Sequence, residues 1–199
     1  MENSLKNMAL SLFIITLISA TAVGMAYRVT KEPIALSKAA QKTAALAQVL
    51  PEFDNDPDAE KQTLDMEGIP VTIYHAKKGN ETVGYAVETA TKQGFSGDIH
   101  LMVGFLPDGK IHNIQVLQHS ETPGLGSKIA DPNNALVVVF RGNSPADLQM
   151  SVRRDGGDFD AITASTISSR AYIDAVERGF RAMRQIISAA EHQKEESHE

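Results

Sequence analysis

Five hydroxyl side chains lie close together near the end of the sequence, within residues 160–169 (Asp-Ala-Ile-Thr-Ala-Ser-Thr-Ile-Ser-Ser). They belong to Thr163, Ser165, Thr166, Ser168 and Ser169, and an amphipathic helical pattern follows them. Because helices favour Ser and Thr as N-terminal caps, one or two of these residues need no function. Five exceed that requirement. The free N–H groups and positive dipole end of a helix start attract anions, so this segment is a candidate phosphate site.

A second loop, residues 121–126, reads Glu-Thr-Pro-Gly-Leu-Gly and follows a predicted strand. Pro123 fixes its own φ, while Gly124 and Gly126 permit positive φ and a close approach of the backbone to a ligand. Taken alone, this sequence is typical of a turn. The chain has no Gly-x-Ser-x-Gly elbow, Walker loop or Gly-x-Gly-x-x-Gly turn, and Gly-Phe-Ser-Gly at 94–97 is too short for a phosphate loop. These absences disfavour hydrolases, NTPases and dinucleotide-binding proteins.

The composition narrows the chemistry further. The 199 residues include no Cys, which excludes disulfides, thiolate zinc sites and Cys-ligated iron–sulfur clusters. Redox chemistry would therefore need a bound organic cofactor. A net charge of −6, from 19 basic and 25 acidic residues, disfavours nucleic acid as a partner. The six histidines show no metal-binding spacing, so no metal site is expected.

The N-terminal part of the sequence is apolar. Met8 to Tyr27 carries no charge, and as a helix it would span about 30 Å, the thickness of a bilayer core. We expect a single-pass membrane anchor over residues 1–29. A cleaved signal peptide is the alternative, because Ala20 and Ala22 could precede a cleavage site. Charged residues flank both ends of the apolar segment, so the positive-inside rule does not decide its orientation.

The remaining patterns predict an α+β fold. A helix is expected from Pro33 to Leu50, followed by an acidic loop over 52–68, so that 30–68 is a helix and linker. Alternating apolar residues predict two hairpins, 71–74 with 82–87 and 99–106 with 111–117. Residues 135–140 and 148–153 could add two more strands. A C-terminal helix is expected from Ser168, packed on the sheet. These elements would form one antiparallel-sheet-rich domain, 69–191, with a charged tail at 192–199.

Together the two loops carry a family resemblance. The chain resembles the G subunit of the Rnf electron-transport complex and is similar to the C subunit of the sodium-pumping NADH:quinone reductase, which share an FMN-binding domain and an N-terminal anchor. In that family a Glu-Thr-Pro-Gly loop precedes an Asp-x-Ile-Ser-Gly-Ala-Thr segment, and a flavin transferase joins FMN to the last Thr by a phosphoester bond. The resemblance implies attachment at Thr166. This sequence departs from the pattern by reading Thr163-Ala164-Ser165 where the family has Ser-Gly-Ala.

The resemblance also implies further contacts and partners. Loop backbone at Gly124, Leu125 and Gly126, and at the two glycines of the 94–97 turn, would approach the flavin ring, and Thr122 would donate a hydrogen bond to it. The remaining hydroxyls would cap the helix or contact phosphate, namely Thr163, Ser165 and Ser168. The protein would carry electrons in an ion-translocating ferredoxin:NAD oxidoreductase complex of the inner membrane, pumping sodium or protons, and would not be a complete enzyme alone. Its domain would face the non-cytoplasmic side, and its partners would be the other membrane subunits, the flavin transferase and membrane lipid.

Two alternatives remain open from the residues. One is an FMN-domain protein of a different membrane reductase. The other is a non-redox, membrane-anchored binding or assembly module, in which the hydroxyl run is a helix cap.

Overall fold

The computed structural model describes residues 2–196, which form two compact units divided between Lys42 and Thr43. The first unit consists of helix α1 (Glu2–Val49) as far as Lys42. One 18-residue window of this helix has a mean hydropathy of 2.1 and no buried residues, so its length and composition suit a membrane span. The expected helix start at Pro33 is wrong, because Pro33 lies inside one continuous helix. Proline removes a single backbone hydrogen bond there, and helix-forming residues on both sides continue the helix.

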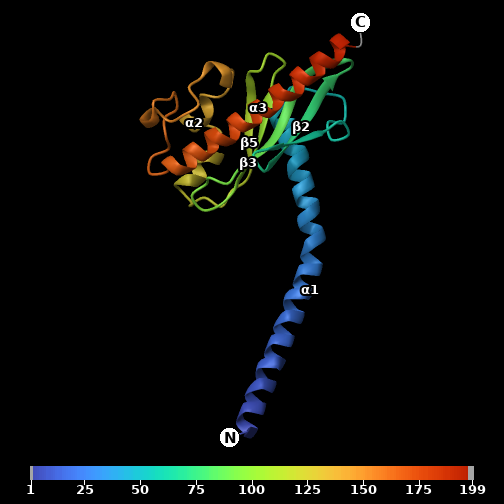
Figure 1. The fold of residues 1–199 in the computed structure, drawn as a ribbon, viewed down its shortest axis with the longest axis vertical. Coiled ribbons are helices and arrows are strands. Elements are labelled where there is room, and N and C mark those ends of the chain that lie inside the picture. Colours follow the sequence, from blue (N-terminus) through green and yellow to red (C-terminus); the bar gives the residue numbers. More distant parts are fainter. Residues whose placement is uncertain (1, 197–199) are drawn as a thin grey trace. The chain divides into compact units, whose positions relative to one another are not determined.

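The second unit is built on a five-stranded antiparallel sheet whose strands follow one another in sequence order (Figure 1). The strands are β1 (Gln62–Met66), β2 (Ile69–Lys78), β3 (Glu81–Thr91), β4 (Ile99–Phe105) and β5 (Ile111–Gln118). The two predicted hairpins are confirmed as β2–β3 and β4–β5. Strand β1 falls within the segment 52–68 that was expected to be a loop. It is an exposed edge strand, so its polar sequence lacks the alternation that marks a half-buried strand.

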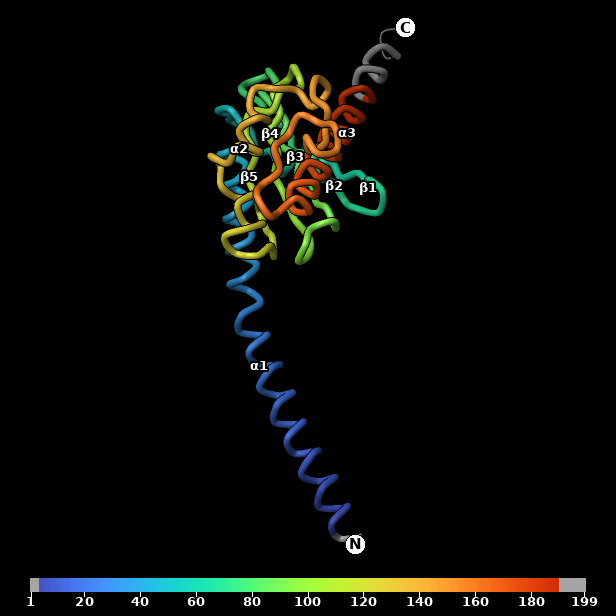
Figure 2. Tube along the Cα trace, turned by 90° about the vertical axis from the view of Figure 1, so that its left-hand side faces the viewer, coloured from blue at the N-terminus to red at the C-terminus, as the bar shows by residue number. Residues whose placement is uncertain are grey.

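Each face of the sheet is covered by a helix. Helix α3 (Thr166–Glu196) lies along one face, as Figures 1 and 2 show, over apolar side chains that include Val71, Ile73, Val87, Leu101 and Val103. The last turns of α1 belong to the second unit and pack on the other face, where Ala45, Leu46, Val49 and Leu50 form a cluster with Tyr74, Ala76, Ala86 and Met102. The predicted α+β class and the C-terminal helix on the sheet are thus confirmed.

The segment between β5 and α3 contains short helices and no strands. They are η1 (Gly126–Ala130), α2 (Ala135–Val138), η2 (Pro145–Asp147) and η3 (Arg153–Asp155). The strands expected at 135–140 and 148–153 are therefore wrong. At 135–138 the side chain of Asn134 accepts the Leu136 N–H at 3.0 Å and caps a helix. At 148–153 only Val152 pairs, in an isolated bridge to Phe159.

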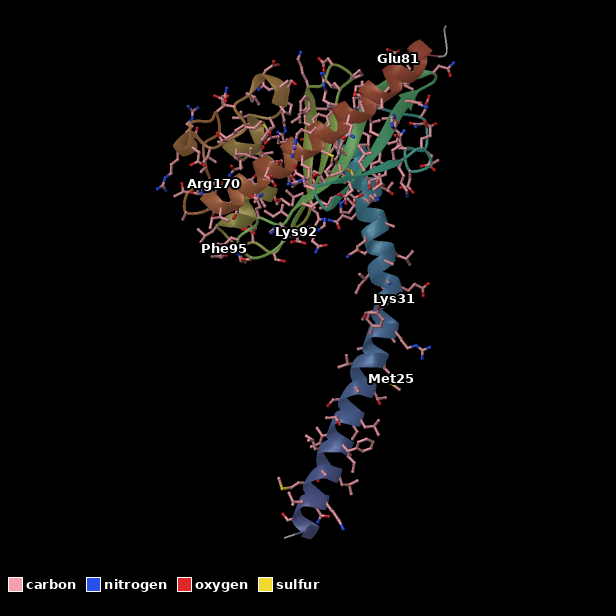
Figure 3. All side chains as sticks on the ribbon, in the orientation of Figure 1. Met25, Lys31, Glu81, Lys92, Phe95 and Arg170 are labelled. Atoms are coloured by element: carbon pink, nitrogen blue, oxygen red, sulfur yellow. The ribbon has the colours of Figure 1, made fainter. Side chains whose placement is uncertain are left out.

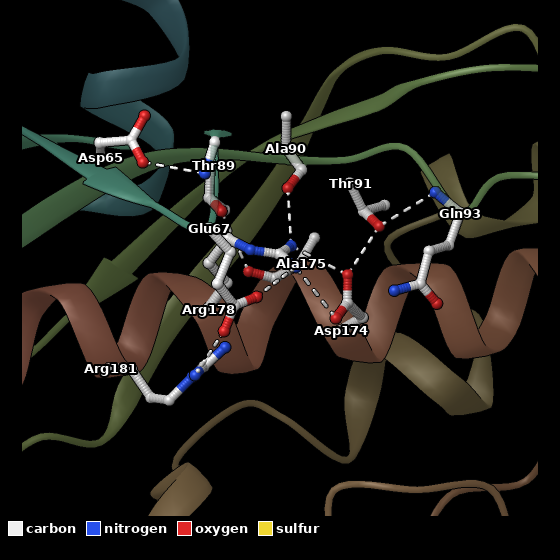
Figure 4. A network of polar contacts seen from close by, with 11 residues as sticks. Asp65, Glu67, Thr89, Ala90, Thr91, Gln93, Asp174, Ala175, Arg178 and Arg181 are labelled. Atoms are coloured by element: carbon white, nitrogen blue, oxygen red, sulfur yellow. Dashed lines mark hydrogen bonds and ion pairs between the residues drawn. The ribbon is translucent and has the colours of Figure 1, made fainter. Parts of the chain in front are cut away.

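Buried polar contacts fix α3 against the sheet (Figure 4). Arg178, only 4% exposed, donates to the Ala90 carbonyl (3.0 Å) and to Asp174 (2.9 and 3.2 Å). Asp174 in turn accepts the Thr91 hydroxyl at 2.6 Å. The backbone of α3 is helical to Glu196, which includes the start of the expected charged tail, while residues 197–199 of that tail lie outside the described residues.

Candidate functional site

A cavity of about 330 Å³ lies where three loop segments meet at the start of α3. Its lining residues are Phe95, Glu121, Thr122, Leu125, Gly126, Ala164, Ser165, Thr166, Ile167 and Ser168. These come from the 94–97 turn, the 121–126 loop and the hydroxyl segment, all singled out from the sequence. The volume falls at the lower end of the range for small-molecule pockets, roughly 300–1,000 Å³.

The side chains of the hydroxyl segment differ in position: some form hydrogen bonds at the helix start, and others line the cavity. The Ser165 carbonyl accepts the Ser169 N–H at 3.0 Å, which begins the α-helical hydrogen-bond pattern. Ser169 Oγ accepts the Ile162 N–H and donates back to the Ser165 carbonyl, both at 2.9 Å, so Ser169 holds the helix start together. Thr163 is exposed and does not line the cavity. Ser165, Thr166 and Ser168 do line it, and of these only Thr166 is partly exposed rather than buried.

The backbone at Ala164 turns the chain into the helix. Its φ of 60° is left-handed, a conformation that costs an alanine roughly 1–2 kcal/mol. The family noted above has glycine at this position, which adopts the same conformation without that cost. The departure at Ala164 therefore preserves the turn but adds strain to the wall of the cavity.

The two glycines of the 121–126 loop serve different purposes. Gly124 has a φ of 73° and its N–H donates to Ser127 Oγ at 2.9 Å, but it does not line the cavity. Gly126 lines the cavity, and a Cβ there would lie 2.6 Å from both Glu121 Oε2 and Ser168 Oγ. Gly124 is thus needed for the turn, and Gly126 for close packing of the loop against α3. Thr122 lines the cavity, while its carbonyl accepts the N–H groups of Leu125 and Ser127 (both 3.2 Å).

Four cavity residues were not among the predicted site residues, namely Phe95, Glu121, Ala164 and Ile167. Phe95 is 65% exposed and forms an apolar rim with Leu125 (42%) and Ile167 (48%). Glu121 is 4% exposed and connects the three segments, because it accepts the Ser168 hydroxyl at Oε2 and the Ser96 N–H at Oε1 (3.1 Å). Phe95 lies in the Gly-Phe-Ser-Gly turn and Glu121 begins the Glu-Thr-Pro-Gly loop, so their positions in these motifs were the available signal.

An ion pair supports the outer side of the helix start. Arg170 donates from Nε and Nη2 to the two carboxylate oxygens of Asp155 at 2.7 and 2.9 Å. The hydrogen bond from Arg170 lowers the pKa of Asp155, so this contact persists to more acidic pH than an ordinary aspartate would allow. Figure 3 shows Arg170 and Phe95 at the same end of the domain.

The arrangement suits a ligand that has one anionic end and one flat apolar end. The first turn of a 31-residue helix offers N–H groups and a positive dipole to an anion beside Thr166. The apolar rim formed by Phe95, Leu125 and Ile167 offers contact area to an aromatic ring. A phosphate-bearing aromatic cofactor fits both ends of this cavity.

Comparison with known proteins agrees with this description. The sequence pattern of the FMN-binding domain family matches residues 94–181, which include all three segments of the cavity. The fold and the site thus define an FMN-binding domain that follows a candidate membrane helix.

The relatives extend over most of the chain. The G subunit of the ion-translocating oxidoreductase complex of Cereibacter sphaeroides is 39% identical over 176 residues, covering 85% of this chain and 80% of that protein. Its counterpart in Shewanella amazonensis is 35% identical over 188 residues (89% and 87%), and that of Haemophilus influenzae 37% over 160 residues (76% and 77%). The chain belongs to the family formed by the G subunits of ion-translocating oxidoreductase complexes.

Proposed function

We propose that this protein is the membrane-anchored flavoprotein subunit of an Rnf-type ion-translocating oxidoreductase complex and carries electrons through FMN attached to Thr166. The names of the relatives support the complex, and the FMN-binding domain supports the cofactor. The other membrane subunits would be its redox partners, and a flavin transferase would attach the cofactor. The soluble domain would lie on the non-cytoplasmic side of the membrane, with α1 held by lipid.

The observation that carries the proposal is the position of Thr166 in the cavity. Among the three hydroxyl side chains that line it, Ser168 donates to Glu121 and Ser165 is buried at 7% exposure. Thr166 is partly exposed, and no hydrogen bond among the described residues involves its hydroxyl. Thr166 is therefore the cavity hydroxyl that a transferase can reach without breaking an internal contact.

Each part of the cavity has a task toward the cofactor. Thr166 Oγ1 would attack the phosphorus of an activated FMN donor, a phosphoanhydride supplied to the transferase. The new Oγ1–P bond replaces the anhydride bond, the other half of the donor leaves as its phosphate, and the hydroxyl proton passes to water. The resulting phosphodiester keeps one negative charge, which the start of α3 would stabilise. Phe95, Leu125 and Ile167 would contact the ring system. The Thr122 hydroxyl would be available to donate a hydrogen bond to it. Bound FMN supplies the capacity to accept and release one or two electrons.

Site mapping tests the attachment. The full chain is expressed with a flavin transferase and digested with trypsin, and the peptide of residues 155–170 is analysed by mass spectrometry. We expect this peptide to carry the mass of FMN less one water. Thr166→Ala should abolish the addition with a loss of at most about 1 kcal/mol in the free energy of unfolding, because one partly exposed hydroxyl is removed.

Thr163→Ala is the matched control, since it removes a hydroxyl from the same peptide but outside the cavity. It should retain the flavin. Flavin on Thr163 or Ser165 would refute the assignment to Thr166 but keep the function. A chain without covalent flavin under all conditions would favour an anchored binding module.

A further inference from the structure

The cavity wall contains a buried carboxylate. The Glu121 side chain is 4% exposed, and its two oxygens accept the Ser168 hydroxyl and the Ser96 N–H. Both donors suit an ionised carboxyl group, which can only accept hydrogen bonds. Glu121 lines the same cavity as Thr166.

Two glycines make room for this carboxylate. A Cβ at Gly126 would lie 2.6 Å from Glu121 Oε2. A Cβ at Gly94 would lie 2.8 Å from Glu121 Oε1 and nearer still, 2.1 Å, to the Gly97 carbonyl oxygen. These distances are shorter than real Cβ contacts, so neither position accepts a side chain while Glu121 keeps its place. The fold therefore accommodates this side chain from two sides.

The charge is compensated only in part. Among the described residues, the ion pairs to Lys and Arg include none with Glu121. A buried carboxylate without a cation is unfavourable unless hydrogen bonds and dipoles offset its lost hydration. Here the offset comes from two donors and from the start of α3, where Ser168 is the third residue. Glu121 therefore places a negative charge in the cavity wall that, among the described residues, no Lys or Arg neutralises through an ion pair.

We propose that the Glu121 carboxylate lowers the reduction potential of the flavin bound at Thr166. The inference depends on the proposed function, because it requires the flavin to occupy this cavity. An electron that passes to the flavin from a redox partner in the complex adds negative charge to the flavin. The negative charge of the Glu121 carboxylate in the cavity wall repels it. Because the Glu121 side chain is only 4% exposed, water screens this repulsion less than it would at an exposed carboxylate, so reduction becomes less favourable. The electron leaves more readily to the next acceptor for the same reason.

The variant Glu121→Gln tests the effect of the carboxylate charge on the flavin potential, because glutamine has nearly the same shape as glutamate but no charge. Its amide oxygen accepts the Ser96 N–H, and its amide nitrogen donates to Ser168 Oγ, so both contacts have a counterpart. The midpoint potential is measured by spectroelectrochemical titration of the flavin-loaded full chain in detergent. We expect a shift to a more positive potential relative to the wild-type protein.

Glu81→Gln is the matched control. Glu81 is exposed at the start of β3, and Figure 3 shows it at the opposite end of the domain from Phe95. The Glu81→Gln substitution changes the net charge by the same amount as Glu121→Gln. The midpoint potential of its flavin should equal that of the wild-type protein. A shift in Glu121→Gln no larger than in Glu81→Gln would overturn the inference.

A second variant, Glu121→Asp, separates charge from geometry. It keeps the charge but shortens the side chain, so the potential should stay near the wild-type value. A positive shift in Glu121→Asp as large as in Glu121→Gln would assign the effect to geometry and overturn the inference. If Glu121→Gln fails to fold or to load flavin, Glu121→Met takes its place as the neutral variant of similar length. A shift in Glu121→Met no larger than in Glu81→Gln would then overturn the inference.

Intact mass is measured before each titration. It separates failure of the proposed function from failure of the inference about Glu121. A wild-type chain without flavin contradicts the proposed function, and the inference fails with it. A flavin-loaded wild type whose potential Glu121→Gln leaves unchanged contradicts the inference alone.

Discussion

At the residue scale, the hydroxyl run shows how neighbouring side chains of one type separate in function. Ser169 bonds both sides of the turn into α3, and Ser168 bonds Glu121. These contacts leave Thr166 as the partly exposed hydroxyl on the cavity. The sequence predicted the segment, and the family resemblance selected Thr166 within it. The burial of Glu121 could not be predicted, because an isolated glutamate is usually exposed and only the tertiary contacts reveal that it is not.

Ala164→Gly should stabilise the domain. Ala164 has a φ of 60°, and glycine relieves the left-handed strain, although it also gains freedom in the unfolded chain. The net gain should be up to about 1 kcal/mol in the free energy of unfolding, measured by urea titration.

Ala146→Gly is the control, for which we expect a change in the free energy of unfolding of opposite sign. Ala146 is exposed in η2 and is not among the described residues with positive φ, so glycine there should destabilise by about 0.5–1 kcal/mol. Equal effects of the two substitutions would argue against backbone strain at Ala164.

At the element scale, local turn residues were enough to predict the two hairpins. The conformation of the segment between β5 and α3 depends on tertiary contacts. The turns between β2 and β3 and between β4 and β5 have positive φ at Gly79 and Gly109, which the sequence marks clearly. The segment 135–138 is helical although it reads as a strand, because Asn134 caps it and its apolar side chains, among them Leu136 and Val137, enter the core. Capping and core packing here outweigh the strand propensity of the valines, which cannot be foreseen from β-branched residues alone.

The attachment of α3 to the sheet should depend on Arg178 far more than on Arg181. Arg178 is 4% exposed and bonds Asp174 and the Ala90 carbonyl (Figure 4). Arg178→Ala removes a donor to the Ala90 carbonyl and leaves Asp174 with the Thr91 hydroxyl but without its cation, so it should cost about 3 kcal/mol in the free energy of unfolding.

Arg181→Ala is the matched comparison. Arg181 is 46% exposed and bonds Glu67, which Arg178 also contacts, at 3.0 Å. Its loss should cost less than about 1 kcal/mol, because exposed ion pairs contribute little. Urea unfolding of both variants measures the difference, and similar losses would contradict a special role for the buried guanidinium.

At the scale of the whole molecule, the boundary of the folded domain lies inside α1 rather than at its end. Residues 43–50 belong to the second unit, where Leu46, Val49 and Leu50 are buried against the sheet. The sequence predicted a helix and an acidic linker over 30–68, because residues 52–68 are acidic and rich in turn formers. Residues 43–50 pack on the sheet and β1 pairs with β2, so these two parts of the segment belong to the second unit, which the composition does not reveal.

Two truncated chains test this boundary. Residues 43–199 should be soluble and unfold cooperatively, since the helical end of α1 is retained. Residues 51–199 should lose roughly 5 kcal/mol of stability, from the burial of two leucines and a valine, and should aggregate. Equal stability of the two chains by urea titration would place the boundary after Leu50.

The same chains test the membrane span. The full chain should remain in the pellet after a carbonate wash of membranes, while residues 43–199 should appear in the soluble fraction. Release of the full chain by carbonate, or a mature N-terminus near residue 23, would contradict an anchor formed by α1.

The most direct test of the central claim is the intact mass of the full chain purified from its native membrane. We expect a mass higher than that of the polypeptide by one FMN less one water, and loss of this increment in Thr166→Ala. A native protein with the mass of the unmodified polypeptide, isolated with its complex partners, would contradict covalent flavin in the cavity at the start of α3.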